Sequence, residues 1–248
     1  MNKEDINKKI EELKNDANYY GDMGKQFLSN SDIGDLLYNP KNFKKKSETT
    51  KALIEGSYFH TAMLEPNKLP YIQVVDASSR NTNIYKDAVK ESGGSMLLLR
   101  SEVDDLNNIV NIMKGNLHFY DNIYAQGNQF EVPNVKEIYG VMWKGKADIV
   151  GTDMIIDIKT TSSISDFRWN AKKYNYDSQA FLYQEFFGKP MVFYVIDKTT
   201  GMLGEYNCSD DFLESGRVKV ISAVDQYNKF FGKDAWADIN SYIIEEEL

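Results

Sequence analysis

The sequence contains very little cysteine, and this scarcity excludes several kinds of site. Cys208 is the single cysteine among 248 residues, so the chain can form neither an internal disulfide nor a zinc or iron–sulfur site built from several cysteines. Because disulfides are typical of oxidising compartments, we expect a cytoplasmic protein. Long hydrophobic runs are also lacking, and none approaches the roughly 18 apolar residues that a membrane span needs. We therefore expect no membrane partner.

The sequence also lacks an excess of basic residues. It has 29 Lys and Arg against 37 Asp and Glu, a net charge of −8. Nucleic-acid-binding proteins usually carry a basic surface, so this balance counts against a DNA partner. The charge is uneven, with lysines gathered in residues 41–51 and an acidic tail at Glu245-Glu246-Glu247. For Phe43-Lys44-Lys45-Lys46, a solvated loop and a phosphate-contacting patch both remain open.

Length and composition are those of a globular protein. With 248 residues, 42% hydrophobic and 13% aromatic, the chain can form one large α/β domain or two small ones. It shows neither internal repeats nor a low-complexity linker, so we expect one domain over 1–248. Its expected parts are a peripheral N-terminal helix within 1–26, a helical segment with His60 in 27–70, a sheet and helix in 128–207, and a C-terminal helix in 210–231. The first helix, over 3–19, can be a peripheral solvated arm or pack on a partner.

Apolar spacing and turn residues predict the other elements. Ser29 or Ser31 can cap a short helix that Asn39-Pro40 ends. We expect longer helices over 51–64, 84–92, 101–124, 164–187 and 210–231, and strands over 71–75, 191–197 and 202–207. Glycine within a helix costs about 1 kcal/mol relative to alanine. Gly56 therefore indicates close approach of another backbone or a ligand.

Residues 128–159 are typical of an antiparallel meander. We expect strand segments over 129–132, 136–143, 146–150 and 154–159. Lys144-Gly145 has the composition of the first tight turn, and Gly151-Thr152-Asp153 that of the second. The second turn would carry Asp148 back beside Asp157.

The end of this meander carries acids and a lysine that can meet at one point. Side chains two residues apart on a strand share a face, so Asp157 and Lys159 point the same way while Ile158 turns into the core. Carboxylates are the hard oxygen ligands that Mg²⁺ and Mn²⁺ prefer. A lysine beside them can orient or deprotonate a water molecule. An exposed strand end with an ordinary ion pair would show the same pattern.

Three other polar residues have both a structural and a functional interpretation. His60 lies in the helix predicted over 51–64, where a lone histidine is more often structural than a ligand; we interpret His118 as structural. Gln179 and Tyr183 are four residues apart and share one helix face. They can be ordinary boundary and core residues, or they can contact a phosphate or a base.

Taken in order, several short motifs resemble one branch of nucleases. They are Leu28-Ser29-Asn30-Ser31 with Asn39-Pro40, Gly56-Ser57-x-x-His60 with Leu64-Glu65-Pro66, Lys144-Gly145-Lys146-Ala147-Asp148, Ile156-Asp157-Ile158-Lys159-Thr160-Thr161 and Gln179-x-x-x-Tyr183. Each is weakly specific, but their order over about residues 27–231 resembles the RecE-type (exonuclease VIII-like) branch of the RecB-like PD-(D/E)XK nucleases. The resemblance implies a mixed α/β fold with a restriction-endonuclease-like core, in which helices flank a central mixed sheet.

The resemblance also implies roles for particular residues. It implies a metal site made of one histidine, two acids and one strand carbonyl, which are His60, Asp148, Asp157 and Ile158. One or two Mg²⁺ ions would bind there, with Mn²⁺ as a substitute, and Lys159 would orient or activate the attacking water. DNA contacts are implied for Gln179, Tyr183, Thr160 and Thr161. Glu137 would help to bind a second metal.

The predicted function is hydrolysis of DNA from double-stranded ends by a metal-dependent exonuclease, in the 5′-to-3′ direction. The resemblance implies phage-type recombination or DNA processing, with a single-strand annealing protein as partner. It also implies a homo-oligomer, because ring-forming members of the family keep basic residues in an inner channel. The alternatives are an endonuclease or single-strand nuclease with the same core, and a catalytically inactive nucleic-acid-binding or inhibitory protein.

Overall fold

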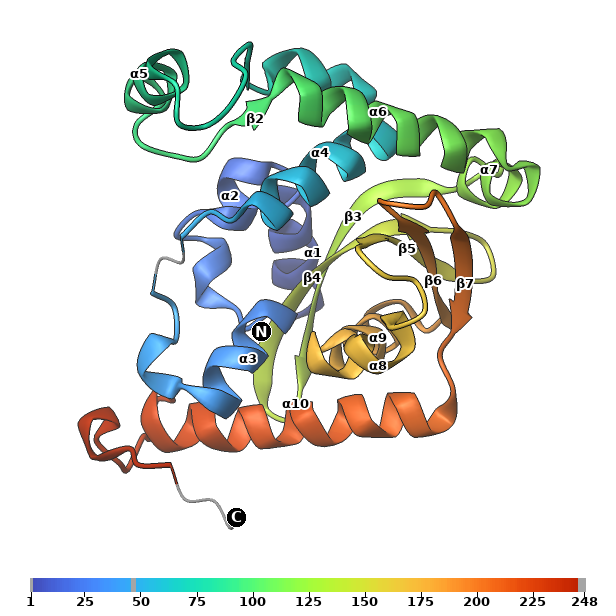
Figure 1. Ribbon diagram of the computed structural model, residues 1–248. Helices are drawn as coiled ribbons and strands as arrows, with labels where there is room; N and C mark the ends of the chain where they lie inside the picture. The colour runs from blue at the N-terminus through green and yellow to red at the C-terminus, as the bar shows by residue number, and fades with distance from the viewer. Residues whose placement is uncertain (1, 46–47, 245–248) are drawn as a thin grey trace.

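The computed structural model describes residues 2–45 and 48–244, and it has the predicted mixed α/β architecture (Figure 1). The helices are α1 Lys3–Glu12, α2 Asp16–Tyr20, α3 Asn30–Tyr38, α4 Lys51–Leu64, α5 Asn83–Glu91, α6 Arg100–Gly115, α7 Leu117–Ile123, α8 Phe167–Lys173, α9 Tyr176–Phe187 and α10 Asp210–Phe230. The strands are β1 Val74–Val75, β2 Leu98–Leu99, β3 Gln129–Ile138, β4 Val141–Val150, β5 Ile155–Thr161, β6 Met191–Asp197 and β7 Leu203–Asn207. Four short 3₁₀ segments, Gly24–Gln26, Pro40–Asn42, Pro66–Tyr71 and Ile239–Ser241, complete the description.

A five-stranded sheet in the order β3-β4-β5-β6-β7 forms the centre. Its strands run antiparallel except β5 and β6, which are parallel and are joined through α8 and α9. Two hydrophobic cores cover the sheet: α3, α9 and α10 pack on one face, and α4, α6 and α7 on the other (Figure 1). Ile156 and Ile158 belong to the second core, which leaves Asp157 between them facing away from it.

Asparagine interrupts three segments that were predicted as single helices. The helix expected over 3–19 breaks at Asn15, whose side chain caps α2 by accepting from the Ala17 N–H at 2.9 Å. The helix expected over 101–124 breaks at Asn116, which caps α7 in the same way. Within 164–187 the break falls at Asn175, which has the left-handed φ of 58°. Asparagine tolerates this conformation and bonds the backbone locally, so it favours helix ends over helix interiors.

The first tight turn of the meander lies five residues before its predicted place. Tyr139 and Gly140 both have positive φ, 52° and 76°, and they join β3 to β4 with Ile138 paired to Val141. Two positive φ angles in a two-residue loop are the mark of the hairpin turn that matches strand twist. The prediction of a turn at Lys144-Gly145 is therefore wrong, whereas the second turn, between β4 and β5, is confirmed.

Gly145 instead allows α9 to approach β4 closely. A Cβ atom built there would lie 2.7 Å from the Tyr183 ring and closer still to the Phe186 ring. Glycine within a strand commonly marks such an approach. The approach of another backbone to Gly56 is wrong, because a Cβ there would meet nothing of the described chain within 4 Å. The alternative, approach of a ligand, stays a prediction, and Gly56 lines the cavity beside the candidate site.

Replacing Gly145 by alanine is expected to destabilise the protein by about 1–3 kcal/mol, because the added methyl group must displace two packed rings. Gly56→Ala is the matched control, and it should stabilise by up to about 1 kcal/mol through helix propensity. Urea unfolding followed by circular dichroism measures both changes. Equal stabilities of the two variants would contradict the packing described for Gly145.

The N-terminal segment packs on the sheet instead of forming a solvated arm. None of the described residues of α1 is buried, but Leu13 and Tyr19 pack with Phe27 and Val135 of β3 in a separate small core. The segment therefore lies beside β3, at one edge of the sheet (Figure 1).

The predicted strand over 71–75 is shortened to Val74–Val75, because Pro66–Tyr71 forms a 3₁₀ helix.

Lys44 pairs with Asp32 at 2.9 Å, so its ammonium does not extend freely into solvent. Lys46 and the acidic tail Glu245-Glu246-Glu247 lie outside the described residues.

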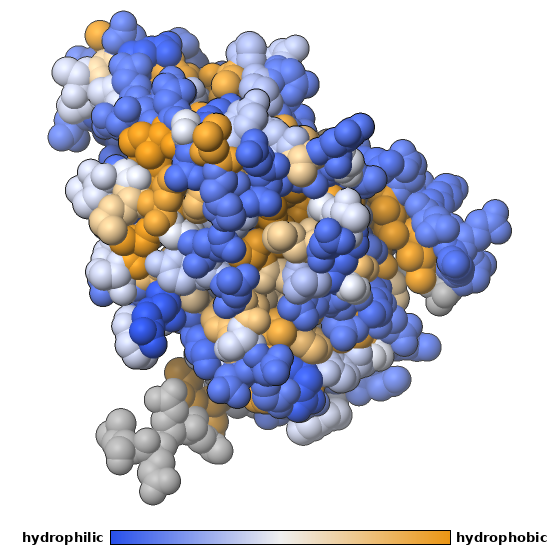
Figure 2. Space-filling view, turned by 90° about the vertical axis from the view of Figure 1, so that its right-hand side faces the viewer, coloured by the Kyte–Doolittle hydropathy of each residue, from blue (hydrophilic) through white to orange (hydrophobic). Residues whose placement is uncertain are grey.

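The face of the molecule in Figure 2 is largely polar, with hydrophobic side chains in small scattered groups. Within residues 2–45 and 48–244, none of the helices has the length and apolar character that a membrane span requires.

Candidate active site

The candidate site lies where β4 and β5 separate. Ladder pairing between these strands ends at Ile149 with Ile156, so the next positions opposite each other are Asp148 and Asp157. There the Ile158 N–H donates a hydrogen bond of 2.8 Å to the Asp148 carboxylate, where a continuing ladder would offer a backbone carbonyl. The N–H and C=O groups of one strand residue point to the same edge, so the Ile158 carbonyl also points towards this opening.

Three side chains from three elements gather at this opening. His60 of α4, Glu131 of β3 and Asp148 of β4 each offer a ligand atom, and these atoms lie within 4.8 Å of one another. His60 Nδ1 lies 3.3 Å from the Asp148 carboxylate. The helix that carries His60 is capped by Thr50 and packs through Phe59 and Met63 on the second core, which fixes the histidine against the sheet.

Asp157 is the most buried acid at the site. Its side chain is 1% exposed and forms an ion pair with Lys159. The amide of Gln179 on α9 donates a hydrogen bond of 2.6 Å to its other oxygen. The Lys159 ammonium also lies 5.2 Å from the centre of the Tyr176 ring, so β5 and α9 together position the acid and the lysine.

Burial and mutual charge shift the ionisation of these groups. Burial raises the pKa of Asp157 to about 6, the charge of Asp148 adds to this rise, and Lys159 opposes it. Burial and Asp148 likewise raise the pKa of Glu131 to about 7. Burial would raise the pKa of Asp148 as well, but His60, Lys159 and the Ile158 N–H together hold it below its usual value. Although burial favours its neutral form, Lys159 has a raised pKa beside Asp157 and Asp148.

These residues fit a hard divalent cation. The clustered ligand atoms come from two carboxylates and one imidazole, with the Asp157 carboxylate on the neighbouring strand, and oxygen-rich sets of this kind suit Mg²⁺ or Mn²⁺ better than soft metals. The Asp157 Oδ1 atom is buried and has the Lys159 ammonium as its charged neighbour. A cation bound at the cluster would reduce the repulsion between Asp157, Asp148 and Glu131.

The other predicted residues lie at varying distances from this centre. Tyr183 is 8% exposed and donates to the Lys146 carbonyl at 2.8 Å, so in this structure it anchors β4. Thr160 and Thr161 follow Lys159 on β5 and are partly buried. The Thr161 hydroxyl bonds the Ser163 carbonyl at 3.1 Å. The interpretation of His118 as structural agrees with its 2.7 Å contact to Glu205.

Glu131, which sequence reasoning missed, lies in the cluster with His60 and Asp148, and Glu137 does not. Glu137 is exposed and pairs with Met142 near the far end of β3, about 20 Å along the strand from Glu131 at 3.3 Å per residue. The prediction for Glu137 is therefore wrong. The signal that could have found Glu131 is the register, because a turn at Tyr139-Gly140 places Glu131 opposite Asp148.

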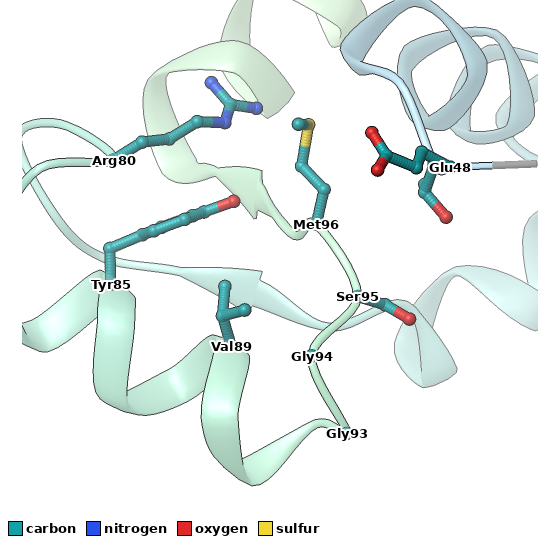
Figure 3. Close-up of a pocket in the computed structure, with 9 residues that line it drawn as sticks. Glu48, Arg80, Tyr85, Val89, Gly93, Gly94, Ser95 and Met96 are labelled. Carbon is teal, nitrogen blue, oxygen red and sulfur yellow. The ribbon is translucent and has the colours of Figure 1, made fainter.

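A cavity of about 690 Å³ opens beside the cluster and is lined by His60, Glu131 and Asp148, together with residues of α2, α3 and β4. A second cavity, of about 480 Å³, lies near α5 and is bounded by Arg80, Tyr85, Val89, the Gly93-Gly94 turn and Met96 (Figure 3). Arg80 is engaged by Glu102 through two hydrogen bonds. Of these two cavities, the first adjoins the candidate site, because His60, Glu131 and Asp148 line it.

One comparison with a solved structure agrees with this fold, and a second gives a lower score. A candidate exonuclease from Eubacterium rectale superposes with a TM-score of 0.64 at 18% identity, over 94% of this chain and 95% of that one. A phage-related exonuclease from Haemophilus somnus 129PT gives a TM-score of 0.32 at 14% identity, over 62% of this chain and 88% of that one.

A comparison with curated proteins gives no significant match. The model of one sequence family, described as a PDDEXK-like domain of unknown function (DUF3799), matches residues 35–241. The site described above falls wholly within this range. The chain belongs to this family of PDDEXK-like domains.

Proposed function

We propose that the protein is a metal-dependent DNA exonuclease that hydrolyses phosphodiester bonds from double-stranded ends in the 5′-to-3′ direction. The observation that carries this proposal is the cluster of His60, Glu131 and Asp148, with the Asp157–Lys159 ion pair on the adjoining strand where β4 and β5 separate. The PDDEXK-like fold supports a hydrolytic nuclease. The direction of digestion and a role in phage-type recombination rest on the resemblance of the sequence motifs.

The cation would be held by His60, Asp148 and Asp157, with Glu131 and the Ile158 carbonyl beside them. One or two Mg²⁺ ions, or Mn²⁺ in their place, would supply positive charge to the scissile phosphate and lower the pKa of a bound water. Gln179 fixes the orientation of the Asp157 carboxylate through its 2.6 Å hydrogen bond. His60 of α4 and Glu131 of β3 lie with Asp148 at this opening.

Lys159 would act on the reacting groups directly. As an ammonium beside Asp157, it can orient the attacking water and stabilise charge on a phosphate oxygen. In the reaction, the water oxygen forms a bond to phosphorus, the bond to the leaving 3′ oxygen breaks, and a proton passes to that oxygen. This division of roles requires Asp157 and Lys159 to remain adjacent, as the packing of β5 against α9 ensures.

The partners and the setting of this reaction are also proposals. We propose double-stranded DNA ends as the substrate, a homo-oligomer as the working form, a single-strand annealing protein as a possible partner and the cytoplasm as the location. A net charge of −8 would then require basic residues to be concentrated along the DNA path.

One assay tests the proposed activity and its main rivals. The substrates are linear duplex labelled at each end in turn and covalently closed circular duplex. Each is incubated with Mg²⁺, and gel electrophoresis shows which labelled strand shortens. The proposal expects early release of a 5′ label, later release of a 3′ label, and an intact circle. Cleavage of the circle would show an endonuclease instead, and preference for a single strand would show a single-strand nuclease. Absence of hydrolysis with Mg²⁺ and Mn²⁺ would overturn the proposed enzyme.

Gln179→Leu is expected to reduce hydrolysis by about 10–100-fold, because it removes the group that orients a predicted metal ligand. If the glutamine acts through Asp157, kcat should fall while KM stays within about twofold. A direct DNA contact would raise KM instead. Steady-state kinetics with saturating Mg²⁺ separates these outcomes, and Gln184→Leu on the same helix provides the control.

A further inference from the structure

Two lysines from distant parts of the chain converge on one carboxylate. Lys146 of β4 lies 2.5 Å from Asp16 Oδ1, and Lys68 of the 3₁₀ helix Pro66–Tyr71 lies 2.7 Å from Asp16 Oδ2. Each oxygen of the carboxylate therefore contacts its own ammonium group. Glu65 is the other acid of this group and lies 2.7 Å from Lys68.

This group lies in the cavity of the candidate active site. Asp16, Lys68 and Lys146 line the same 690 Å³ space as His60, Glu131 and Asp148. The Lys146 side chain is 6% exposed, and a buried ammonium is costly unless an anion accompanies it. The cavity therefore has a built site for one anion next to the predicted metal centre.

Asp16 is the most easily displaced member of the group. Its side chain is 47% exposed and belongs to a helix of five residues, so the carboxylate can rotate into solvent while the buried neighbours Leu13 and Tyr19 hold the backbone on the sheet. Lys146 lies on the interior strand β4, and the Tyr183 hydroxyl donates a hydrogen bond to its backbone carbonyl. The acid can thus move away while at least one cation stays in place.

We propose that Lys68 and Lys146 form a phosphate subsite for the nucleic-acid backbone, and that Asp16 occupies it as an internal substitute for phosphate until substrate displaces it. The nucleic-acid ligand rests on the proposed function. A carboxylate and a phosphate both present paired oxygens to ammonium groups, and phosphate carries the greater charge. Tyr20 lines the same cavity with 69% of its surface exposed, which offers a ring for base stacking that free phosphate would not use.

The proposal predicts opposite effects for the two kinds of charge in the cavity. Removing Asp16 frees the subsite, so Asp16→Asn should tighten DNA binding about three- to tenfold. Removing a lysine should weaken binding by a similar factor and reduce the salt dependence by about one phosphate contact. A purely structural ion pair would instead lower stability without tightening binding.

The experiment measures fluorescence anisotropy of a labelled linear duplex, with Ca²⁺ in place of Mg²⁺ and the DNA checked to be intact. The variants are Asp16→Asn, Lys68→Gln, Lys146→Gln and the double variant Asp16→Asn with Lys68→Gln. Asp22→Asn is the control for charge, because this acid lies on the same segment with its side chain fully exposed. Lys68→Gln keeps the test informative if the buried Lys146→Gln fails to fold.

We expect Asp16→Asn to bind more tightly than Asp22→Asn, and the gain to shrink when Lys68 is also replaced. Equal binding by Asp16→Asn and Asp22→Asn, or wild-type affinity of a folded Lys68→Gln variant, would overturn the subsite. A gain of thermal stability with inorganic phosphate, but no gain in DNA affinity, would overturn the nucleic-acid ligand. If these shifts appear while hydrolysis is absent, the proposed enzyme fails and the subsite stands; hydrolysis without the shifts rejects the subsite alone.

Discussion

Replacing Asp157 by asparagine should reduce Mg²⁺-dependent digestion of linear duplex by at least about a thousandfold, equivalent to about 4 kcal/mol of transition-state stabilisation. The substitution keeps the shape of the side chain but removes the charge that would hold the cation and pair with Lys159. Lys159→Ala should cause a comparable loss, because it removes the ammonium that faces the water and the phosphate. Initial rates on end-labelled duplex measure both effects.

The control for these variants is Asp153→Asn, which removes an acid from the exposed turn of the same hairpin and should leave the rate within about twofold. Circular dichroism and thermal unfolding establish that each variant is folded, since Asp157 is deeply buried. Digestion at the wild-type rate by folded Asp157→Asn or Lys159→Ala would show that this site is not where hydrolysis occurs.

The local part of the site could be predicted from the sequence because it depends on the two-residue period of a strand. Asp157 and Lys159 lie together and Ile158 is buried, as alternation along β5 requires. The turn after β4 depends on Gly151 and two polar neighbours, and it brings Asp148 opposite Asp157 as expected. Placing His60 beside them needed the resemblance to the nuclease branch, since nothing local connects α4 to the sheet.

Other features depended on packing between residues far apart in the chain and could not be predicted from the local sequence. Lys144-Gly145 has the composition of a turn, yet Gly145 lies within β4 because Tyr183 and Phe186 of α9 press against it. The position of this turn sets the register of β3, which places Glu131 opposite Asp148, whereas Glu137 had been suggested only by the resemblance. The three helix breaks at asparagine were local signals in principle, but apolar spacing continued across each of them.

The contact between Asp16 and Lys146 joins residues 130 positions apart in the chain. Sequence patterning marked the N-terminal segment as peripheral because α1 has few apolar residues. The structure shows that the following residues, Asp16, Tyr19 and Tyr20, line the cavity beside the candidate site. A weak hydrophobic pattern thus indicated limited burial of α1, but it gave no information about which cavity the next helix would reach.

A divalent cation should stabilise the folded protein, because the site holds buried acids close together. The raised pKa values of Asp157, about 6, and Glu131, about 7, reflect burial together with the charge of Asp148. At an ion concentration about 100 times the dissociation constant, binding adds about 2.7 kcal/mol to the free energy of unfolding. For a chain of this size we expect the midpoint of thermal unfolding to rise by about 5–10 °C.

Thermal unfolding with EDTA, Mg²⁺ or Mn²⁺ measures this rise without requiring DNA or activity. Asp148→Asn should abolish most of it, whereas Asp153→Asn should keep it, because Asp153 lies in an exposed turn. Protons compete with the ion for Asp157, so the rise should be smaller at pH 5, below its pKa of about 6, than at pH 8. An equal rise in wild type and Asp148→Asn would place the bound ion elsewhere, and His60 would then be a structural residue of α4.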